Sequence, residues 1–214
     1  MKAIILAGGR GKRLRPITDK IPKPLIPINN KPLIERTIKY LKKYGINEII
    51  ISSGYKSNLI EKFLKKKKNF GCKIIFSIEK TPLGTGGAIK KALKHVNEKS
   101  FLVLNGDIVT NIDLKKILKK PNTIAANELK TKFGTMNIKN NKILKFNEKK
   151  DVTNVWMNPG IYHLSINTEK LIPKKGSLEG IVFPKMAKNK TLETVKFKNV
   201  LWFSIDSHKD IEEC

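Results

Sequence analysis

A glycine-rich, basic segment follows a short apolar run near the amino terminus. Residues 3–7 are apolar and predict a buried strand. Gly8, Gly9 and Gly11 come next, interleaved with Arg and Lys side chains. Glycine lets the backbone turn sharply, so that its N–H groups approach a ligand, and the basic side chains supply positive charge. Such a loop at the carboxyl end of a strand is suited to hold phosphates.

Two common phosphate-binding patterns do not fit this loop. The Walker pattern requires Ser or Thr after Gly-Lys, but Gly11-Lys12 is followed by Arg13. The dinucleotide fingerprint requires a third glycine where Leu14 stands. What remains is Gly-Gly-x-Gly-x-Arg-Leu-x-Pro-x-Thr and then Pro-Lys-Pro around Lys23. This string resembles the signature of the sugar-phosphate nucleotidyltransferases.

The resemblance implies a reaction in which an NTP and a sugar 1-phosphate give an NDP-sugar and pyrophosphate. Arg13 would stabilise the triphosphate and the transition state, and Lys23 would bridge the phosphates of both substrates. No protein nucleophile is required, so catalysis rests on positioning and charge neutralisation. The loop residues expected to bind the nucleotide are Leu6, Ala7, Gly8, Gly9, Gly11 and Lys12.

An aspartate follows the buried apolar run 101–104, in the sequence Asn105-Gly106-Asp107. Ligands of open parallel sheets bind at the carboxyl ends of the strands, and a carboxylate placed there is suited to hold Mg²⁺. The alternative is a turn or a helix cap, since Asn and Asp favour both. With the glycine loop in the same chain, we assign Asp107 to the metal.

The segment 202–210 departs from the family's pattern. Many relatives carry an aromatic residue, Asp-Ile-Gly-Thr and then Pro-x-Asp, and the first aspartate is the second metal ligand. Aligned on Asp210, Ser204 takes the ligand position, whereas Asp206 is the nearby carboxylate ahead of the expected terminal helix. We prefer Asp206 as the second Mg²⁺ ligand. In the alternative, Asp206 or the residue after it caps the helix, and Asp107 alone anchors the metal.

A second glycine cluster, Glu-Lys-Thr-Pro-Leu-Gly-Thr-Gly-Gly-Ala at 79–88, joins an expected strand to an expected helix. Because this segment has few large side chains, a flat base or ribose can lie on its backbone. The alternative is that the segment is only a flexible connection. In the family this region contacts the base, and Pro-Leu-Gly-Thr is common in guanylyl-transferring members. The expected nucleotide contacts are Glu79, Pro82, Leu83, Gly84, Thr85 and Gly86. Glu79 is the candidate acceptor for guanine, unless it faces solvent or pairs with Lys80.

Residues in the second half resemble the family's sugar-phosphate side. They are Gly134, Glu148, Lys149, Asn158 and Gly160. The Glu-Lys pair of the family binds sugar hydroxyls and the sugar phosphate, and these side chains offer hydroxyl acceptors and a positive charge. The alternative is a pair of exposed charges in a lysine-rich loop.

Strand-like and helix-like segments alternate through the first half, which predicts a parallel sheet with helices on both faces. The expected fold class is α/β, a single-domain Rossmann-like three-layer sandwich with a mostly parallel central sheet and a smaller antiparallel sugar-binding portion. We expect 1–214 to be one catalytic domain without a C-terminal left-handed β-helix. The expected strands are 2–6, 48–52, 73–78, 101–104, 135–138, 143–146, 155–164 and 192–197, and the expected helices are 32–44, 57–67, 86–96, 178–188 and one from 207.

Composition narrows the class of protein. The 214 residues carry a formal net charge of +26, but the lysines are spread along the chain and no aromatic stacking platform or zinc finger accompanies them. Nucleic acid is therefore not favoured as a partner. The two cysteines form no CxxC pair, and no apolar run reaches the roughly 20 residues of a membrane span. We expect a cytoplasmic enzyme without a signal peptide or membrane partner, and a homodimer is left open.

The short length, the 79–88 stretch and the absence of a β-helix repeat most resemble the heptose 1-phosphate and mannose 1-phosphate guanylyltransferases. This resemblance implies GTP and mannose or heptose 1-phosphate as the preferred substrates. The alternatives are a uridylyltransferase acting on N-acetylmuramate 1-phosphate or another sugar 1-phosphate, and a cytidylyltransferase. Two further alternatives belong to other classes of protein: a non-catalytic regulatory subunit and a basic nucleic-acid-binding module.

Overall fold

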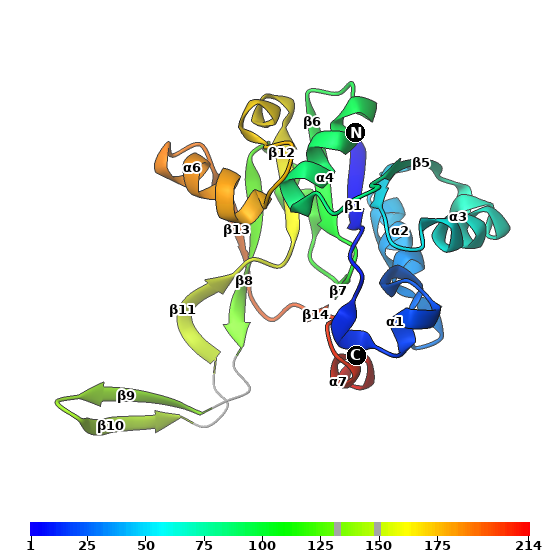
Figure 1. Cartoon of the computed structure of the whole chain (residues 1–214). Helices are drawn as coiled ribbons and strands as arrows, with labels where there is room; N and C mark the ends of the chain where they lie inside the picture. Colours follow the sequence, from blue (N-terminus) through cyan, green and yellow to red (C-terminus); the bar gives the residue numbers. More distant parts are fainter. Residues whose placement is uncertain (131–133, 148–150) are drawn as a thin grey trace.

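An eight-stranded mixed sheet forms the centre of the molecule (Figure 1). This computed structural model describes residues 1–130, 134–147 and 151–214, without the side chains of 130, 147 and 151–154. The strands of the sheet are β1 (Lys2–Ala7), β4 (Glu48–Ser53), β5 (Lys73–Ile78), β6 (Ser100–Asn105), β8 (Thr123–Lys130), β11 (Asp151–Met157), β12 (Ile161–Ser165) and β13 (Glu193–Phe197).

The first half of the chain builds the parallel part of this sheet. β1 lies between β6 and β4, β5 lies outside β4, and all three pairings are parallel. The carboxyl ends of β1 and β6 therefore meet at one edge, which brings the glycine loop beside Asp107. The antiparallel part begins at β12, which joins β6 to β8. β13 pairs in parallel with the other edge of β8.

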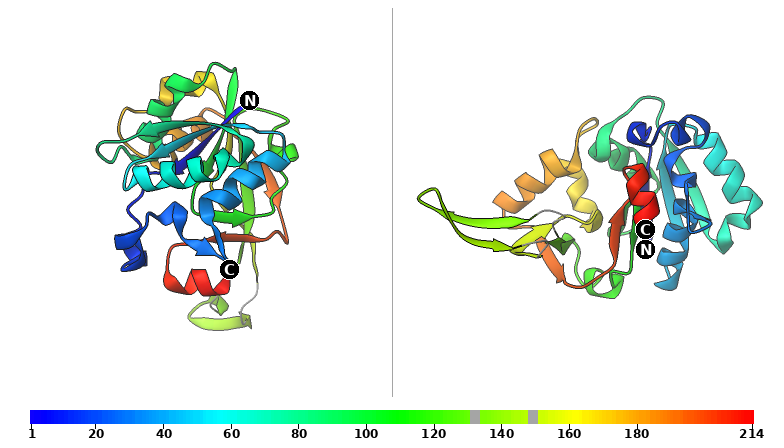
Figure 2. Two further views of the ribbon diagram at one scale, coloured as in Figure 1. Left: turned by 90° about the vertical axis from the view of Figure 1, so that its right-hand side faces the viewer. Right: turned by 90° about the horizontal axis from the view of Figure 1, so that it is seen from below.

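Helices cover both faces of the sheet, as the three-layer prediction requires (Figure 2). Alternate residues of β1 point to opposite faces, so Ile5 packs in one core cluster and Ile4 in the other. α2 (Leu33–Lys43) and α3 (Ser57–Lys66) pack on the face of Ile5, and α4 (Gly84–Ala92) and α6 (Phe183–Lys188) on the face of Ile4.

A third, smaller core ties the glycine loop to the end of the chain. Leu14, Ile26 and Leu33 are buried together with Ile205, and Ile211 of α7 (His208–Glu213) packs against them. The shorter elements around this region are η1 (Lys12–Leu14), α1 (Ile17–Lys20), η2 (Lys23–Leu25), β2 (Pro27–Ile28), β3 (Lys31–Pro32), β7 (Ile108–Thr110), α5 (Leu114–Ile117) and β14 (Trp202–Ser204). The loop thus rests on a packed base rather than on solvent.

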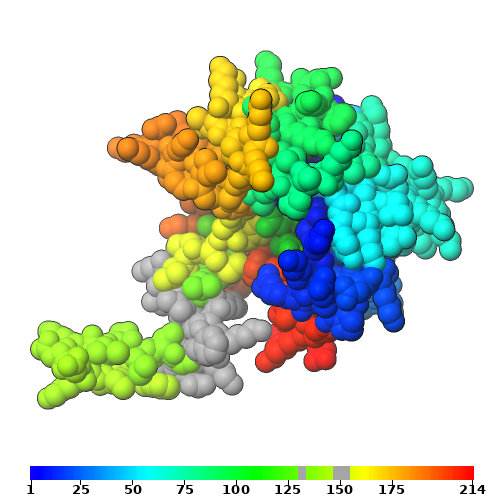
Figure 3. Space-filling view, in the orientation of Figure 1, coloured from blue at the N-terminus to red at the C-terminus, as the bar shows by residue number. Residues whose placement is uncertain are grey.

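The predicted hairpin after Gly134 forms and extends away from the body (Figure 3). Its strands, β9 (Thr135–Lys139) and β10 (Lys142–Asn147), pair only with each other among the described residues. Ile138 lies opposite Ile143, and both side chains are more than half exposed. β11 and β12, which flank Asn158-Pro159-Gly160, also match the prediction.

Other element boundaries differ from the sequence predictions. The segment 178–188, by contrast, is divided as its internal proline predicts, into η6 (Leu178–Val182) and α6, with Pro184 in the first turn of α6. The helix expected from Gly86 begins at Gly84, and its last turn is η4 (Leu93–His95). η3 (Lys68–Gly71) and η5 (Ile166–Leu171) are further short turns. The strands β2, β3, β7, β8 and β14 were not predicted. Among the described residues, no helix is long and apolar enough to cross a membrane.

Candidate active site

Two cavities meet at the carboxyl end of β1. The first has a volume of about 290 Å³, and the second has a volume of about 300 Å³. Leu6, Gly9 and Asp107 line both of them. The first is also lined by Ala7, Gly11, Lys12, Arg13, Leu14, Lys23, Pro24, Gly106 and Asp206, and the second by Gly8, Ser52, Glu79, Pro82, Gly84, Thr85, Ala88 and Asn105. Most of the predicted site residues therefore lie together.

Local packing determines the shape of the glycine loop. Gly11 has a φ of +61°, and a Cβ there would lie 2.9 Å from Thr18 Cγ2 and 3.3 Å from Lys23 Cβ. Only glycine fits that backbone in that space. The Thr18 hydroxyl donates to the Gly11 carbonyl at 3.0 Å. These contacts hold the loop against the segment that carries Lys23, so the two basic motifs share one cavity.

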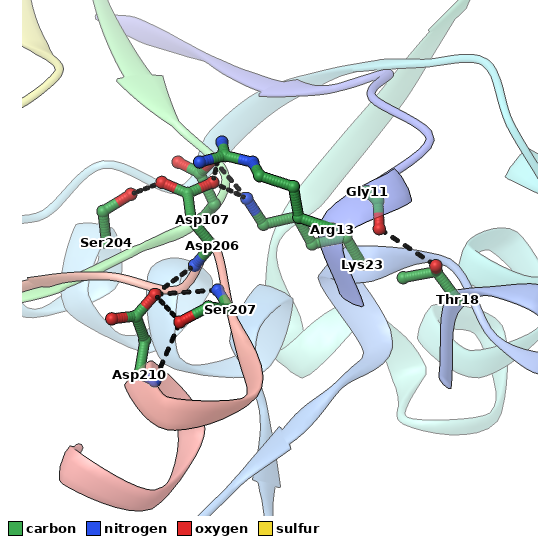
Figure 4. A network of polar contacts seen from close by, with 9 residues as sticks. All are labelled: Gly11, Arg13, Thr18, Lys23, Asp107, Ser204, Asp206, Ser207 and Asp210. Carbon is green, nitrogen blue, oxygen red and sulfur yellow. Dashed lines mark hydrogen bonds and ion pairs between the residues drawn. The ribbon is translucent and has the colours of Figure 1, made fainter. Parts of the chain in front are cut away.

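Four charged side chains converge in the first cavity (Figure 4). The Lys23 ammonium donates to Asp107 Oδ2 at 2.7 Å and to Asp206 Oδ1 at 2.9 Å. The Arg13 guanidinium donates to the same Asp206 Oδ1 at 2.8 Å. The Lys23 side chain is 12% exposed, whereas that of Arg13 is 75% exposed. Lys23 is thus built into the site, and Arg13 covers it from the solvent side.

A short two-stranded ribbon brings Asp206 to Asp107. β14 pairs antiparallel with β7, and Ile205 N donates to the Asp107 carbonyl at 3.0 Å. The cap of α7 is made by Ser207 and Asp210, which form a capping box. The carboxylate of Asp206 is therefore not the cap, and it points into the cavity instead (Figure 4).

The environment of Asp206 keeps its carboxylate ionised. Burial raises the pKa of Asp206, but hydrogen bonds from Lys23 and Ser204 and the charges of Lys23 and Arg13 outweigh it, so the pKa lies below its usual range. Ser204 Oγ donates to Asp206 Oδ2 at 2.8 Å. Because the folded pKa is lowered, the carboxylate protonates only as the pH falls below the usual range for aspartate.

Glu79 gives the second cavity a carboxylate in addition to that of Asp107. Glu79 Oε1 accepts from Ser52 Oγ at 3.2 Å, and Oε2 accepts from Leu83 N at 3.0 Å. The side chain is thus held by these groups rather than extended into solvent. Gly84 has a φ of +74°, and a Cβ there would lie 2.5 Å from the Gly176 carbonyl oxygen, so the start of α4 requires glycine.

A hydrogen-bonded chain beside this cavity centres on Glu179, which the sequence analysis missed. Glu179 Oε2 accepts from Thr85 Oγ1 at 2.5 Å and from Ser177 Oγ at 2.8 Å. Tyr162 donates to Glu179 Oε1 at 3.3 Å and accepts from Asn158 Nδ2 at 2.9 Å. Burial, and then the charge of Glu179, raises the pKa of Tyr162, so its hydroxyl stays protonated. The chain links the nucleotide side to Asn158 on the predicted sugar side.

The remaining predicted residues divide into three groups. Gly160 lies beside Asn105, since a Cβ on Gly160 would be 2.5 Å from Asn105 Nδ2. Leu83 contributes its N–H to Glu79, and Gly86 is buried and donates its N–H to the Gly176 carbonyl at 2.9 Å. Gly134 is at the start of the β9–β10 hairpin, and Glu148 and Lys149 lie outside the described residues.

Comparison with known proteins identifies the family. The family model described as Nucleotidyl transferase matches residues 2–213. The chain is a member of the nucleotidyl transferase family. The sequence prediction of a sugar-phosphate nucleotidyltransferase is therefore confirmed, and the protein is an enzyme of this class.

Two relatives and one solved structure show which members of the family this chain is similar to. The chain is 44% identical over 170 residues to a D-glycero-alpha-D-manno-heptose 1-phosphate guanylyltransferase of Campylobacter jejuni, covering 77% of this chain and 76% of the relative. It is 39% identical to the protein of that name from Aneurinibacillus thermoaerophilus, over 76% and 74% of the two chains. The crystal structure of HddC from Yersinia pseudotuberculosis superposes with a TM-score of 0.77 at 32% identity, over 99% and 96% of the chains.

The two carboxylates of this nucleotidyl transferase suit a hard divalent cation. Asp107 Oδ2 and Asp206 Oδ1 already accept from one ammonium, so both oxygens are directed at a single cation position. Carboxylate oxygens are the ligands that Mg²⁺ prefers, and Mg²⁺ commonly uses one or two of them together with substrate phosphates. Within 1–130, 134–147 and 151–214 no group of three or more His, Cys, Asp or Glu side chains gathers at a metal-binding distance.

Proposed function

We propose that this enzyme transfers the guanylyl group of GTP to a manno-configured hexose or heptose 1-phosphate and releases pyrophosphate. The observation that carries the proposal is the pair of cavities that meet at Asp107. One is lined by basic side chains suited to a triphosphate, and the other by glycines and the oriented Glu79 carboxylate. The names of the relatives from Campylobacter jejuni and Aneurinibacillus thermoaerophilus, and the HddC structure complexed with GMP-PN, support guanine.

The mechanism requires positioning rather than a protein nucleophile. An oxygen of the sugar phosphate attacks the α-phosphorus in line with the leaving pyrophosphate. Arg13 and Lys12 bind the triphosphate, and Lys23 lies between the two phosphate-bearing substrates. Asp107 and Asp206 would hold Mg²⁺, which supplies positive charge to the transferring phosphoryl group when bound. Ser204 orients the Asp206 carboxylate through the 2.8 Å hydrogen bond.

The test is a screen of pyrophosphate release. Each of GTP, UTP, CTP and dTTP is combined with mannose, heptose, glucose and N-acetylmuramate 1-phosphates in the presence of Mg²⁺. We expect turnover with GTP and a manno-configured sugar 1-phosphate. Equal or better use of UTP or CTP would refute the guanine assignment and favour a uridylyl- or cytidylyltransferase. Nucleotide binding without turnover on any pair would indicate a regulatory subunit. Steeply salt-dependent binding to DNA or RNA without turnover would indicate a nucleic-acid-binding module.

Glu79→Gln is expected to reduce the selectivity for GTP. Guanine presents two adjacent donors, N1–H and the exocyclic amine, and a carboxylate accepts from both, whereas an amide replaces one acceptor with a donor. We expect kcat/KM for GTP to fall at least about tenfold, with little change for UTP, because one polar group is left unpaired. Glu98→Gln is the matched control, since Glu98 pairs with Lys2 at the opposite end of β1. An equal fall for all four NTPs would show that Glu79 is only structural.

A further inference from the structure

Asn105 carries a polar group that no step of the proposed mechanism uses. It is the last residue of β6 and follows the fully buried apolar residues 101–104. Its amide oxygen, Oδ1, is buried and has no hydrogen-bond partner among the described residues. Folded proteins rarely leave a buried acceptor unpaired, because the group has lost its contacts with water and gained none in exchange. A leucine here would continue the apolar run without that cost, so packing alone does not explain the asparagine.

The turn after β6 does not explain this amide either. In an Asx turn the side-chain oxygen accepts from a nearby backbone N–H, but Oδ1 of Asn105 accepts from none in the described part of the chain. The amide lies instead against Gly160, where a Cβ would be 2.5 Å from Asn105 Nδ2 and 2.7 Å from its Cγ. Asn105 N also donates to the Gly160 carbonyl at 2.9 Å. These contacts place Asn105 beside the predicted sugar side.

Asn105 also lines the second cavity, in which the other polar side chains already have partners. These paired side chains are Ser52, Glu79, Thr85 and Asp107. Of this set, Asn105 is the residue with a buried acceptor that no described group satisfies. A ligand in the cavity that brings a hydrogen-bond donor to Oδ1 would therefore remove the cost of its burial.

The substrates of the proposed function offer few donors for this oxygen. Phosphate oxygens accept at neutral pH, and the N–H groups of guanine are assigned to Glu79. Hydroxyls remain, and the contact with Gly160 favours those of the sugar 1-phosphate over those of the ribose. Asn105 is two residues from Asp107, which lines both cavities. The hydroxyl nearest to the phosphate of a sugar 1-phosphate is the one on carbon 2, so it is the donor that lies closest to this part of the site.

We propose that the amide oxygen of Asn105 accepts a hydrogen bond from the hydroxyl on carbon 2 of the sugar 1-phosphate, and that Asn105 thereby determines part of the sugar specificity. The proposal rests on the proposed function for the identity of the two substrates. Mannose and glucose differ only in the configuration at carbon 2. A buried acceptor that fits one orientation of this hydroxyl is left unpaired by the other orientation and by a 2-deoxy sugar, and such a site discriminates strongly.

The test compares mannose 1-phosphate with its 2-deoxy analogue, using the NTP that gives the highest turnover in the pyrophosphate-release screen. The wild type is expected to prefer mannose 1-phosphate at least about tenfold in kcat/KM. Asn105→Leu keeps most of the side-chain volume and removes the amide. It is expected to lower kcat/KM for mannose 1-phosphate at least about tenfold and to change that for the 2-deoxy analogue less than about threefold. The two sugars then become nearly equal substrates.

Thermal unfolding separates a binding role of Asn105 from a structural one. Asn105→Leu removes a buried unpaired oxygen, so its Tm without substrate is expected to equal or exceed that of the wild type. A lower Tm together with an equal fall in kcat/KM for both sugars would overturn the proposal. Asn105→Ala replaces Asn105→Leu if the latter does not fold. Asn97→Leu is the matched control, since Asn97 is exposed beyond the other end of β6, and kcat/KM for both sugars is expected to stay within about twofold.

The remaining outcomes distinguish this proposal from the proposed function. If no pair of substrates reacts, calorimetry of mannose 1-phosphate and its 2-deoxy analogue gives the same comparison from their affinities. A wild type that does not discriminate between the two sugars overturns the assignment of Asn105, whereas guanylyl transfer is decided by pyrophosphate release. An Asn105→Leu enzyme that loses discrimination between GTP and 2′-deoxy-GTP, and keeps it between the sugars, would assign the amide to the ribose and also overturn the proposal.

Discussion

Asp107→Asn is expected to lower turnover by about 100-fold or more, which corresponds to about 2.7 kcal/mol of transition-state stabilisation. The substitution keeps the shape of the side chain and removes its charge. Asp107 lines both cavities and accepts from Lys23, so the loss affects the point at which the two cavities meet. The measurement is the rate of pyrophosphate release at saturating NTP, sugar 1-phosphate and Mg²⁺.

Asp113→Asn is the matched control for this variant. Asp113 carries the same charge six positions along the chain, where its side chain accepts from Lys115 N as the cap of α5. Asn caps helices about as well as Asp, so stability and turnover are expected to stay near the wild-type values. Near-wild-type turnover of a folded Asp107→Asn enzyme would remove Asp107 from the metal site.

The parallel half of the fold was predictable because its signals are local. From Lys2 to Asn105, short apolar runs alternate with segments of helical spacing. Each apolar run forms a strand that is covered on both faces, and such strands are strongly hydrophobic in sequence. The glycine loop and Asp107 follow two of these strands. Once the strands are parallel and adjacent, the shared sheet edge brings the loop and the carboxylate together without further information.

The partners of Asp206 were not predictable in the same way. β7 and β14 are three residues each, too short to show an alternating pattern. Yet the pairing of Ser204 with Ile108 decides that the carboxylate at 206, rather than the hydroxyl at 204, faces Asp107 and Lys23. The sequence analysis preferred Asp206 from chemistry alone. The structural reason is the pairing register of β7 and β14, which depends on tertiary contacts.

Polar residues explain two other gaps in the prediction. β8 contains the buried Asn127 and Glu128, which interrupt the apolar alternation expected of a strand, and Glu128 is compensated by Lys198 at 3.2 Å. Glu179 precedes Gly180 in a π-helical turn and belongs to no motif, so its link to Thr85 and Tyr162 becomes visible only in three dimensions. Both depend on partners far away in the sequence.

We expect the basic residues of the first cavity to have different roles. Lys23 is nearly buried and bonded to both carboxylates, whereas Arg13 is largely exposed and bonded to Asp206 alone. A cation fixed at the centre of a site acts mainly on charge that develops in the transition state. A cation at the rim acts mainly on capture of the anionic substrate. The two side chains should therefore affect different kinetic constants.

Lys23→Ala is expected to lower kcat about 100-fold or more and to leave the affinity for NTP within about threefold, because a preorganised charge is lost mainly from the transition state. Arg13→Ala is expected to weaken NTP binding at least about tenfold, with a smaller effect on kcat. Steady-state kinetics measures kcat and calorimetry measures the affinity for NTP, so together they distinguish the two expected effects. Arg15→Ala is the control, since Arg15 belongs to the same loop but pairs with Asp19 at 3.1 Å. If both variants keep wild-type NTP affinity and turnover, the basic loop has only a structural role.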